Sequence, residues 1–189
     1  MKQETYDSLM INPVIAAIKD EEGKEKCIHY EDLQLVFVLY GSVVTIVDIV
    51  RDLKAAGKCV FVHMDLISGL SSKDDAVNFI AEYTDADGII STRPEQLKRG
   101  QELGLTTVLR IFAIDSRSLS KAGSKHYAEH ADMIEVLPGV IPKVISNLTG
   151  QIRIPLVAGG LISDKEDVMA ALDAGAVAIS STSEQVWNM

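Results

Sequence analysis

Short apolar segments alternate along the chain with longer segments in which apolar residues recur at helical spacing. The apolar segments cover residues 13–18, 35–39, 59–64, 88–91, 107–112, 133–137, 155–158 and 177–180. Several of them are near-continuous runs of Val, Ile and Leu, which is typical of parallel strands buried on both faces. The pattern therefore predicts about eight strands, each separated from the next by a helical or loop segment.

The segments between these strands carry the signals of helices. Helices are expected over residues 43–56, 73–83, 94–103, 117–129, 141–148 and 165–174, with a short last one at 183–188. Glycines that can close a last helical turn stand at Gly57, Gly104 and Gly175. Candidate N-caps stand at Ser72, Ser116 and Asp164, and Pro94 suits a first turn. The first connection, residues 19–32, is acidic and only weakly helical.

Eight such units without a flexible linker between them predict a single α/β domain over residues 1–189. Right-handed crossovers of this length can close into a compact (β/α)8 barrel of the TIM type with short loops. The alternative is an open, doubly wound sheet, which usually has fewer strands and a glycine-rich first turn. The residues after the first strand, Ile18-Lys19-Asp20, do not form such a turn. The barrel is therefore the favoured fold.

Composition and charge limit the setting and the partners. No segment has the apolar length of a membrane span, and residues 1–12 lack the apolar core of a secretory signal. Two distant cysteines, Cys27 and Cys59, favour a reducing, cytoplasmic location and argue against a cysteine metal site. The formal net charge of −9 argues against a nucleic-acid partner, because such binding relies on Lys and Arg.

In a barrel of this type, binding residues collect where the strands end. Gly159 and Gly160 follow the seventh strand, while Ser181 and Thr182 follow the eighth. Glycines let backbone N–H groups approach an anion, and hydroxyls before a short helix add donors. We expect a phosphate group to bind at these two loops. The alternative is that the glycines form only a tight turn and the serine only caps the helix.

Further polar residues end other strands. Arg110 interrupts an apolar strand, so it either pairs with Glu135 on the next strand or faces a ligand. His63 and Asp65 alternate along one strand and should share a face. Asp65 could act as a general base, accept bonds from ligand hydroxyls, or be a buried carboxylate bonded to backbone, and Glu135 allows the same alternatives. Lys19 could steer an anion or simply be solvated.

Signals for catalysis or metal binding are weak. His126 and His130 have the spacing of one helical face, but we expect no third ligand beside them, so zinc is not expected. There is no GxSxG, Walker or HExxH motif and no Cys/His nucleophile pair. We therefore assign no catalytic residue, no metal and no cofactor. Trp187 is expected to pack the last helix onto the barrel.

Several of these segments together resemble one known family, the glycerol uptake operon antiterminator regulatory proteins. The segments are Asn12-Pro13-Val14-Ile15-Ala16-Ala17, Phe61-Val62-His63-Met64-Asp65-Leu66-Ile67, Gly69-Leu70-Ser71, Asp87-Gly88-Ile89-Ile90-Ser91-Thr92, Arg110-Ile111-Phe112, Glu135-Val136-Leu137-Pro138-Gly139 and Val157-Ala158-Gly159-Gly160-Leu161-Ile162. The resemblance implies a (β/α)8 barrel that senses glycerol 3-phosphate. It also implies binding to the leader mRNA of glycerol genes, which prevents premature termination.

The RNA partner that the resemblance implies conflicts with the net charge, but one region is basic. Residues 91–127 contain seven Lys or Arg residues and three acidic ones. Arg117, Lys121 and Lys125 recur every four residues, as along one helical face, and Lys98 and Arg99 lie on the preceding helix. We predict an RNA-binding patch on these two helices. The alternative is an ordinary solvated face.

Three functions remain open at this stage. The first is a transcription antiterminator that responds to glycerol 3-phosphate and binds leader mRNA. The second is an aldolase, isomerase or phosphodiesterase that acts on a small phosphate ester, with Asp65 or Glu135 as base and Arg110 as electrophilic partner. The third is a ligand-binding barrel that acts through a protein partner. The sequence does not decide between a monomer and a homo-oligomer.

Overall fold

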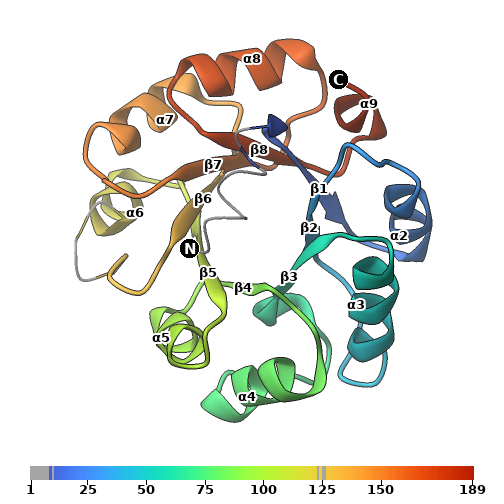
Figure 1. The fold of residues 1–189 in the computed structure, drawn as a ribbon. Helices are drawn as coiled ribbons and strands as arrows, with labels where there is room; N and C mark the ends of the chain where they lie inside the picture. Colours follow the sequence, from blue (N-terminus) through green and yellow to red (C-terminus); the bar gives the residue numbers. More distant parts are fainter. Residues whose placement is uncertain (1–8, 10, 123, 125–126) are drawn as a thin grey trace.

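The described residues form a closed barrel of eight parallel strands, surrounded by helices (Figure 1). The computed structural model describes residues 9, 11–122, 124 and 127–189. The strands are β1 Val14–Ile18, β2 Leu35–Val38, β3 Cys59–His63, β4 Gly88–Ser91, β5 Thr106–Phe112, β6 Met133–Leu137, β7 Leu156–Gly159 and β8 Ala178–Ser181. Each strand pairs in parallel with the next, and β8 pairs with β1. The predicted barrel is confirmed and the open sheet is excluded.

Helices follow most strands and lie outside the barrel. They are α2 Glu21–Ile28, α3 Ile46–Ala55, the 3-10 helix η1 Met64–Leu66, α4 Asp74–Tyr83, α5 Pro94–Glu102, α6 Ser116–Ala122, α7 Pro142–Thr149, α8 Lys165–Asp173 and α9 Glu184–Trp187. None of them, within the described part of the chain, has both the length and the apolar character needed to cross a membrane.

Two helical predictions need correction. The connection at residues 19–32 contains a full helix, α2, which Asp20 caps by accepting a hydrogen bond from Gly23 N at 2.8 Å. The helix predicted over 117–129 is shorter, because α6 ends at Ala122 and Tyr127–His130 form turns and a bend. His130 is therefore not on a helix. His126 lies outside the described residues.

The predicted caps agree only in part. Asp164 caps α8 by accepting a hydrogen bond from Asp167 N at 2.9 Å, as predicted. Ser72 was predicted as a cap, but α4 has Lys73 at its N-cap position and no side-chain cap bond there. Ser116 is the first residue of α6, while Asp115 accepts a hydrogen bond from Ser118 N at 2.7 Å. In both cases the helix begins one residue away from the predicted position, which is within the usual uncertainty of helix boundaries.

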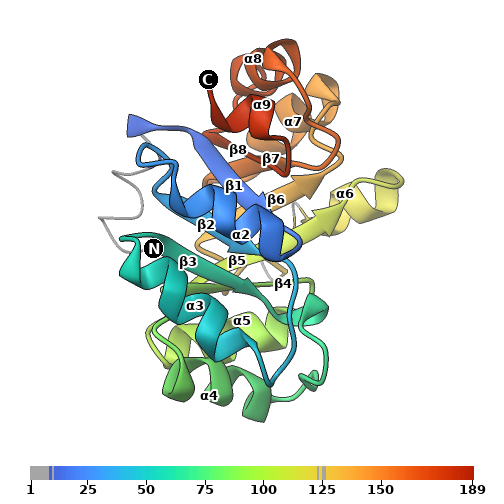
Figure 2. The same ribbon diagram turned by 90° about the vertical axis from the view of Figure 1, so that its right-hand side faces the viewer.

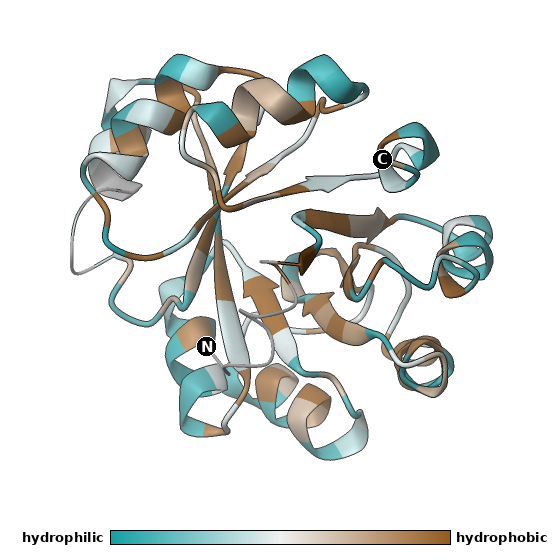
Figure 3. Ribbon diagram, turned by 45° about the horizontal axis from the view of Figure 1, so that its top comes forward, coloured by the Kyte–Doolittle hydropathy of each residue, from teal (hydrophilic) through white to brown (hydrophobic). Residues whose placement is uncertain are grey.

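Apolar side chains form two clusters, one inside the barrel and one between the barrel and the helices. The inner cluster contains Phe37, Phe61, Val108, Met133 and Ala178, among others. The outer cluster contains the alternate strand positions and the inward faces of the helices. Figure 3 shows the strands as mostly apolar and the helices as two-faced. This double burial explains why the strands lack an apolar–polar alternation.

The strands run in one direction, so all their carboxyl ends gather at one end of the barrel (Figure 2). Side chains two residues apart on a strand share a face. The positions that follow the inner apolar residues toward this end are polar on four strands. They are His63 after Phe61, Arg110 after Val108, Glu135 after Met133 and Ser180 after Ala178. The barrel interior therefore changes from apolar to polar at its carboxyl end.

Candidate functional site

A buried ion pair forms the centre of this polar layer. Arg110 and Glu135 face each other in the register of β5 and β6, and Arg110 Nε donates to Glu135 Oε2 at 2.6 Å. Ser180 on β8 donates to the other carboxylate oxygen, Oε1, also at 2.6 Å. Arg110 is 6% exposed and Glu135 is 1% exposed. The pairing that the sequence offered as one alternative is present, and Ser180, which the sequence analysis omitted, completes it.

Gly159 leaves the space that this network occupies. A Cβ atom at Gly159 would lie 2.5 Å from Glu135 Oε1 and 2.6 Å from Ser180 Oγ. Any side chain there would collide with both partners, so the position requires glycine. Gly159 follows the predicted seventh strand, where a glycine lets backbone approach an anion, and the buried network gives a second reason for glycine there.

His63 lies in the same layer at the end of β3. It is 2% exposed, and neither ring nitrogen has a hydrogen-bond partner among the described residues. Burial, together with the positive charge of Arg110, lowers the pKa of His63 to about 3. The imidazole is therefore neutral near pH 7, and it is too weak a base to serve as an efficient proton shuttle at that pH.

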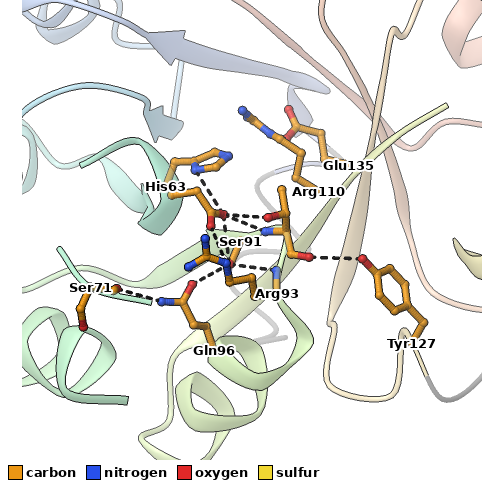
Figure 4. Close-up of polar contacts among 10 residues, drawn as sticks. His63, Ser71, Ser91, Arg93, Gln96, Arg110, Tyr127 and Glu135 are labelled. Atoms are coloured by element: carbon orange, nitrogen blue, oxygen red, sulfur yellow. Dashed lines mark hydrogen bonds and ion pairs between the residues drawn. The ribbon is translucent and has the colours of Figure 1, made fainter. Parts of the chain in front are cut away.

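Asp65 lies beside His63 but not on the same strand. β3 ends at His63, and Asp65 belongs to η1, so the prediction that both alternate along one strand is wrong. The two side chains are nevertheless close, with His63 Nδ1 4.0 Å from Asp65 Oδ2 (Figure 4). Asp65 Oδ2 accepts hydrogen bonds from Thr92 N at 2.9 Å and Thr92 Oγ1 at 3.3 Å. Arg93 Nε lies 3.5 Å from Oδ1.

Thr92, Arg93 and Tyr127 are neighbours of this site that the sequence analysis did not assign. Tyr127 Oη donates to the Thr92 carbonyl at 3.2 Å, which joins the segment after α6 to the end of β4 (Figure 4). Thr92 lies two positions after Ile90, a member of the inner cluster, but the sequence does not show which positions of β4 face inward. Tyr127 could not be identified either, because its segment was predicted as helix.

The loops after β7 and β8 contain the predicted phosphate-binding residues. Gly160 has φ of +74°, and Leu161 after it also has a positive φ of +64°, so the turn is tight. The Ser181 hydroxyl donates to the Ile162 carbonyl at 2.7 Å and accepts from Ser183 N at 3.0 Å. Ser181 therefore holds the two loops together, whereas Thr182 is exposed.

Thr182 lies near Lys19 at the side of the site. Both line a hollow of about 230 Å³ between α2 and the segment that joins β8 to α9. Trp187 also lines it, and the Trp187 indole donates to the Ser181 carbonyl at 2.7 Å. Trp187 thus packs the last helix onto the barrel, as predicted. The structure brings Arg110, Glu135 and Gly159 together at the centre, and places Lys19 and Thr182 at the edge.

The residues of the predicted RNA patch are less uniform than the sequence implied. Lys98 and Arg117 are exposed, on α5 and α6. Arg99 donates to Asn78 Oδ1 at 2.8 Å and to Glu102 at 3.0 Å, so its charge is partly engaged. Lys121 lies on α6, but Lys125 lies outside the described residues. Of the predicted three-residue stripe, the described helix α6 therefore contains only Arg117 and Lys121.

The described residues contain no group of three or more His, Cys, Asp or Glu side chains that could hold a metal ion. Together with Asp65 and Arg93 beside it, the polar layer contains two cations, two carboxylates, a neutral imidazole and hydroxyls. Such a set can bind an oxygen-rich anion through charge-assisted and neutral hydrogen bonds. It offers fewer means of moving protons, because the buried Glu135 carboxylate is already bonded at both oxygens.

Comparison with known proteins gives consistent matches along the chain. A family model described as glycerol-3-phosphate responsive antiterminator matches residues 14–187. A protein of Escherichia coli (strain K12), named uncharacterized protein YgcP, is 43% identical over 178 residues. That match covers 94% of this chain and 93% of the relative.

Two crystal structures resemble this chain over nearly its whole length. One is a glycerol uptake operon antiterminator regulatory protein from Listeria monocytogenes, with a TM-score of 0.88 and 31% identity. It covers 94% of this chain and 95% of its own. The other is a glycerol uptake operon antiterminator-related protein from Thermotoga maritima, with a TM-score of 0.80 and 31% identity, covering 95% and 100% of the two chains. The matches thus extend from β1 to α9.

Proposed function

The chain belongs to the glycerol-3-phosphate responsive antiterminator family, and we propose that it is a transcription antiterminator of glycerol uptake and utilisation genes. In this proposal it binds the leader mRNA of those genes in the cytoplasm, responds to glycerol 3-phosphate, and prevents premature termination. The ligand binds at the carboxyl end of the barrel and favours the form that binds RNA better.

The observation that carries this proposal is the buried polar layer around Arg110. Burying the Arg110 guanidinium costs desolvation free energy, which its ion pair with Glu135 only partly offsets. A binding role would explain why the barrel keeps these charges. Barrels of this type commonly bind phosphate at the loops after strands seven and eight. We assign the phosphate to the loops of Gly160 and Thr182, with Lys19 at the edge. Gly159, Glu135 and Ser181 shape the site from within.

The same layer favours binding over catalysis. His63 has a pKa of about 3, which makes it a poor general base near neutral pH. Both oxygens of Glu135 are bonded. We therefore propose a regulatory protein without a catalytic residue, with glycerol 3-phosphate as an effector.

The proposal is tested by measuring leader-RNA affinity with and without glycerol 3-phosphate. Couplings between two sites typically change affinity about 5- to 150-fold, and we expect an increase in that range. Glycerol and inorganic phosphate serve as controls and should have little effect. A run-off transcription assay should show fewer terminated transcripts when protein and ligand are both present. Failure to bind leader RNA in either condition would refute the function, and equal affinity in both would refute gating by the ligand.

We further propose that the RNA contacts the basic residues on α5 and α6. A variant with Lys98→Glu, Arg117→Glu and Lys121→Glu should bind leader RNA more weakly, because each lysine or arginine contact releases counterions. The slope of log affinity against log salt should fall by about 2, from roughly 0.7 per lost single-strand contact. The control variant carries Arg51→Glu, Arg153→Glu and Lys165→Glu, which changes the net charge equally elsewhere. If both variants lose affinity to the same extent, no local patch exists.

A further inference from the structure

The described part of the barrel leaves three buried side-chain polar atoms without a hydrogen-bond partner, and all three lie in one place. They are Nδ1 and Nε2 of His63 and Oδ1 of Asp65. A buried polar group without a hydrogen-bond partner is destabilising, so such groups call for an explanation. The two side chains are neighbours, since His63 Nδ1 is 4.0 Å from Asp65 Oδ2 (Figure 4). Arg93 Nε lies 3.5 Å from Asp65 Oδ1 as an ion pair, but no described residue donates a hydrogen bond to that oxygen. Their clustering suggests that a ligand supplies the missing partners.

Their position in the fold separates them from the proposed phosphate loops. His63 ends β3 and Asp65 follows in η1, whereas Gly160 and Thr182 follow β7 and β8. In the closed ring, β3 and β7 lie on opposite sides (Figure 1). Arg110 on β5 lies midway between them around the ring.

The chemistry of the two side chains selects a hydroxyl-bearing group and disfavours a phosphate. Asp65 is a carboxylate that accepts hydrogen bonds at Oδ2 from Thr92 and pairs with Arg93 at Oδ1. A carboxylate only accepts hydrogen bonds, so it favours a ligand group that can donate one, such as a hydroxyl, over a phosphate dianion. His63 is neutral near pH 7, because its pKa is lowered to about 3, so it provides one donor and one acceptor but no charge. A hydroxyl can donate to a carboxylate and can both donate to and accept from a neutral imidazole. Two adjacent hydroxyls would satisfy both side chains.

We propose that His63 and Asp65 bind a vicinal diol, which orients a polyol phosphate with its hydroxyls at β3 and its phosphate at β7 and β8. This inference rests on the proposed function, since it assigns the two ends of the same effector. It makes the diol a determinant of specificity. Esters that carry a phosphate without adjacent hydroxyls should therefore be poor effectors.

The test combines removal of a ligand hydroxyl with removal of the imidazole. Calorimetry would measure the affinity for three ligands: glycerol 3-phosphate, inorganic phosphate and 3-hydroxypropyl phosphate. The last of these lacks the middle hydroxyl. For the wild type, we expect the loss of the hydroxyl to weaken binding about 10- to 100-fold. His63→Phe should weaken the binding of glycerol 3-phosphate by a similar factor and leave the binding of 3-hydroxypropyl phosphate nearly unchanged. This is the non-additivity that a thermodynamic cycle shows for two groups in contact.

Further variants keep the test decisive. His63→Gln retains a donor and an acceptor and should recover part of the discrimination, and the exposed His29→Phe should change nothing. A nitrogen NMR signal from His63 should shift with glycerol 3-phosphate but not with inorganic phosphate. Equal losses for all three ligands in His63→Phe would overturn the diol assignment while leaving the proposed function intact. Failure of the wild type to bind glycerol 3-phosphate would overturn both.

Discussion

An Arg110→Met variant is expected to unfold with a free energy about 3–5 kcal/mol lower than that of the wild type. The reason is the partner that remains. Glu135 is 1% exposed, and without the guanidinium it would keep only the Ser180 hydroxyl as a hydrogen-bond donor among the described residues. An ionised carboxylate that is desolvated and unpaired is among the most destabilising groups in a protein interior. Urea unfolding followed by circular dichroism would measure the change.

Two control variants test whether the loss of stability comes from leaving the buried Glu135 charge unpaired. Arg51→Met breaks an exposed pair with Asp48, in which both side chains are more than 60% exposed (64% and 63%), so it should cost less than about 1 kcal/mol. The double variant Arg110→Met/Glu135→Met removes both buried charges and should regain most of the lost stability. It should still bind glycerol 3-phosphate more weakly than the wild type, because the charged layer that shapes the ligand site is gone. If Arg110→Met costs no more than Arg51→Met, the buried pair does not have the structural weight assigned to it.

The barrel could be predicted because its strands and helices have different periodicities. Parallel strands covered on both faces need runs of Val, Ile and Leu, and no other common arrangement places eight such runs between helical segments. The pairing of Arg110 with Glu135 was among the predicted alternatives, because neighbouring strands in a barrel lie side by side. A polar residue in each of two adjacent apolar strands has few other ways to satisfy its charge.

The inner and outer faces of a strand could not be told apart from the sequence. Because both faces are apolar, nothing in β8 shows that Ala178 and Ser180 point inward while Ile179 and Ser181 do not. The sequence pattern therefore points to Ser181 at the end of β8, whereas the side chain that bonds Glu135 is Ser180, one position earlier. The prediction for Asp65 was wrong for a related reason. β3 ends at His63, one residue before the predicted end, so the side chains after it no longer alternate as on a strand. The end of α6 could not be predicted either. The sequence has no proline in residues 117–129, and a single glycine, Gly123, can also occur inside a helix.

A Gly159→Ala variant should be destabilised by about 1–3 kcal/mol and should bind glycerol 3-phosphate at least tenfold more weakly, through displacement of the buried network. The added methyl group would lie 2.5 Å from Glu135 Oε1 and 2.6 Å from Ser180 Oγ, and neither atom can retreat without breaking its hydrogen bond. Urea unfolding and calorimetry on the same samples would measure both effects.

The matched control for this substitution is Gly150→Ala, at the end of α7. Gly150 has an ordinary helical φ of −70°, and its nearest neighbour to an added Cβ would be Ser146 O at 3.5 Å. Alanine there should be neutral or should stabilise the protein by about 0.4–1 kcal/mol, because it reduces the freedom of the unfolded chain. A Gly159→Ala variant that behaves like Gly150→Ala would mean that the network can move to accept a methyl group. The close approach of Gly159 to Glu135 would then not be a requirement for the polar layer, and the ligand site would be more adaptable than its packing implies.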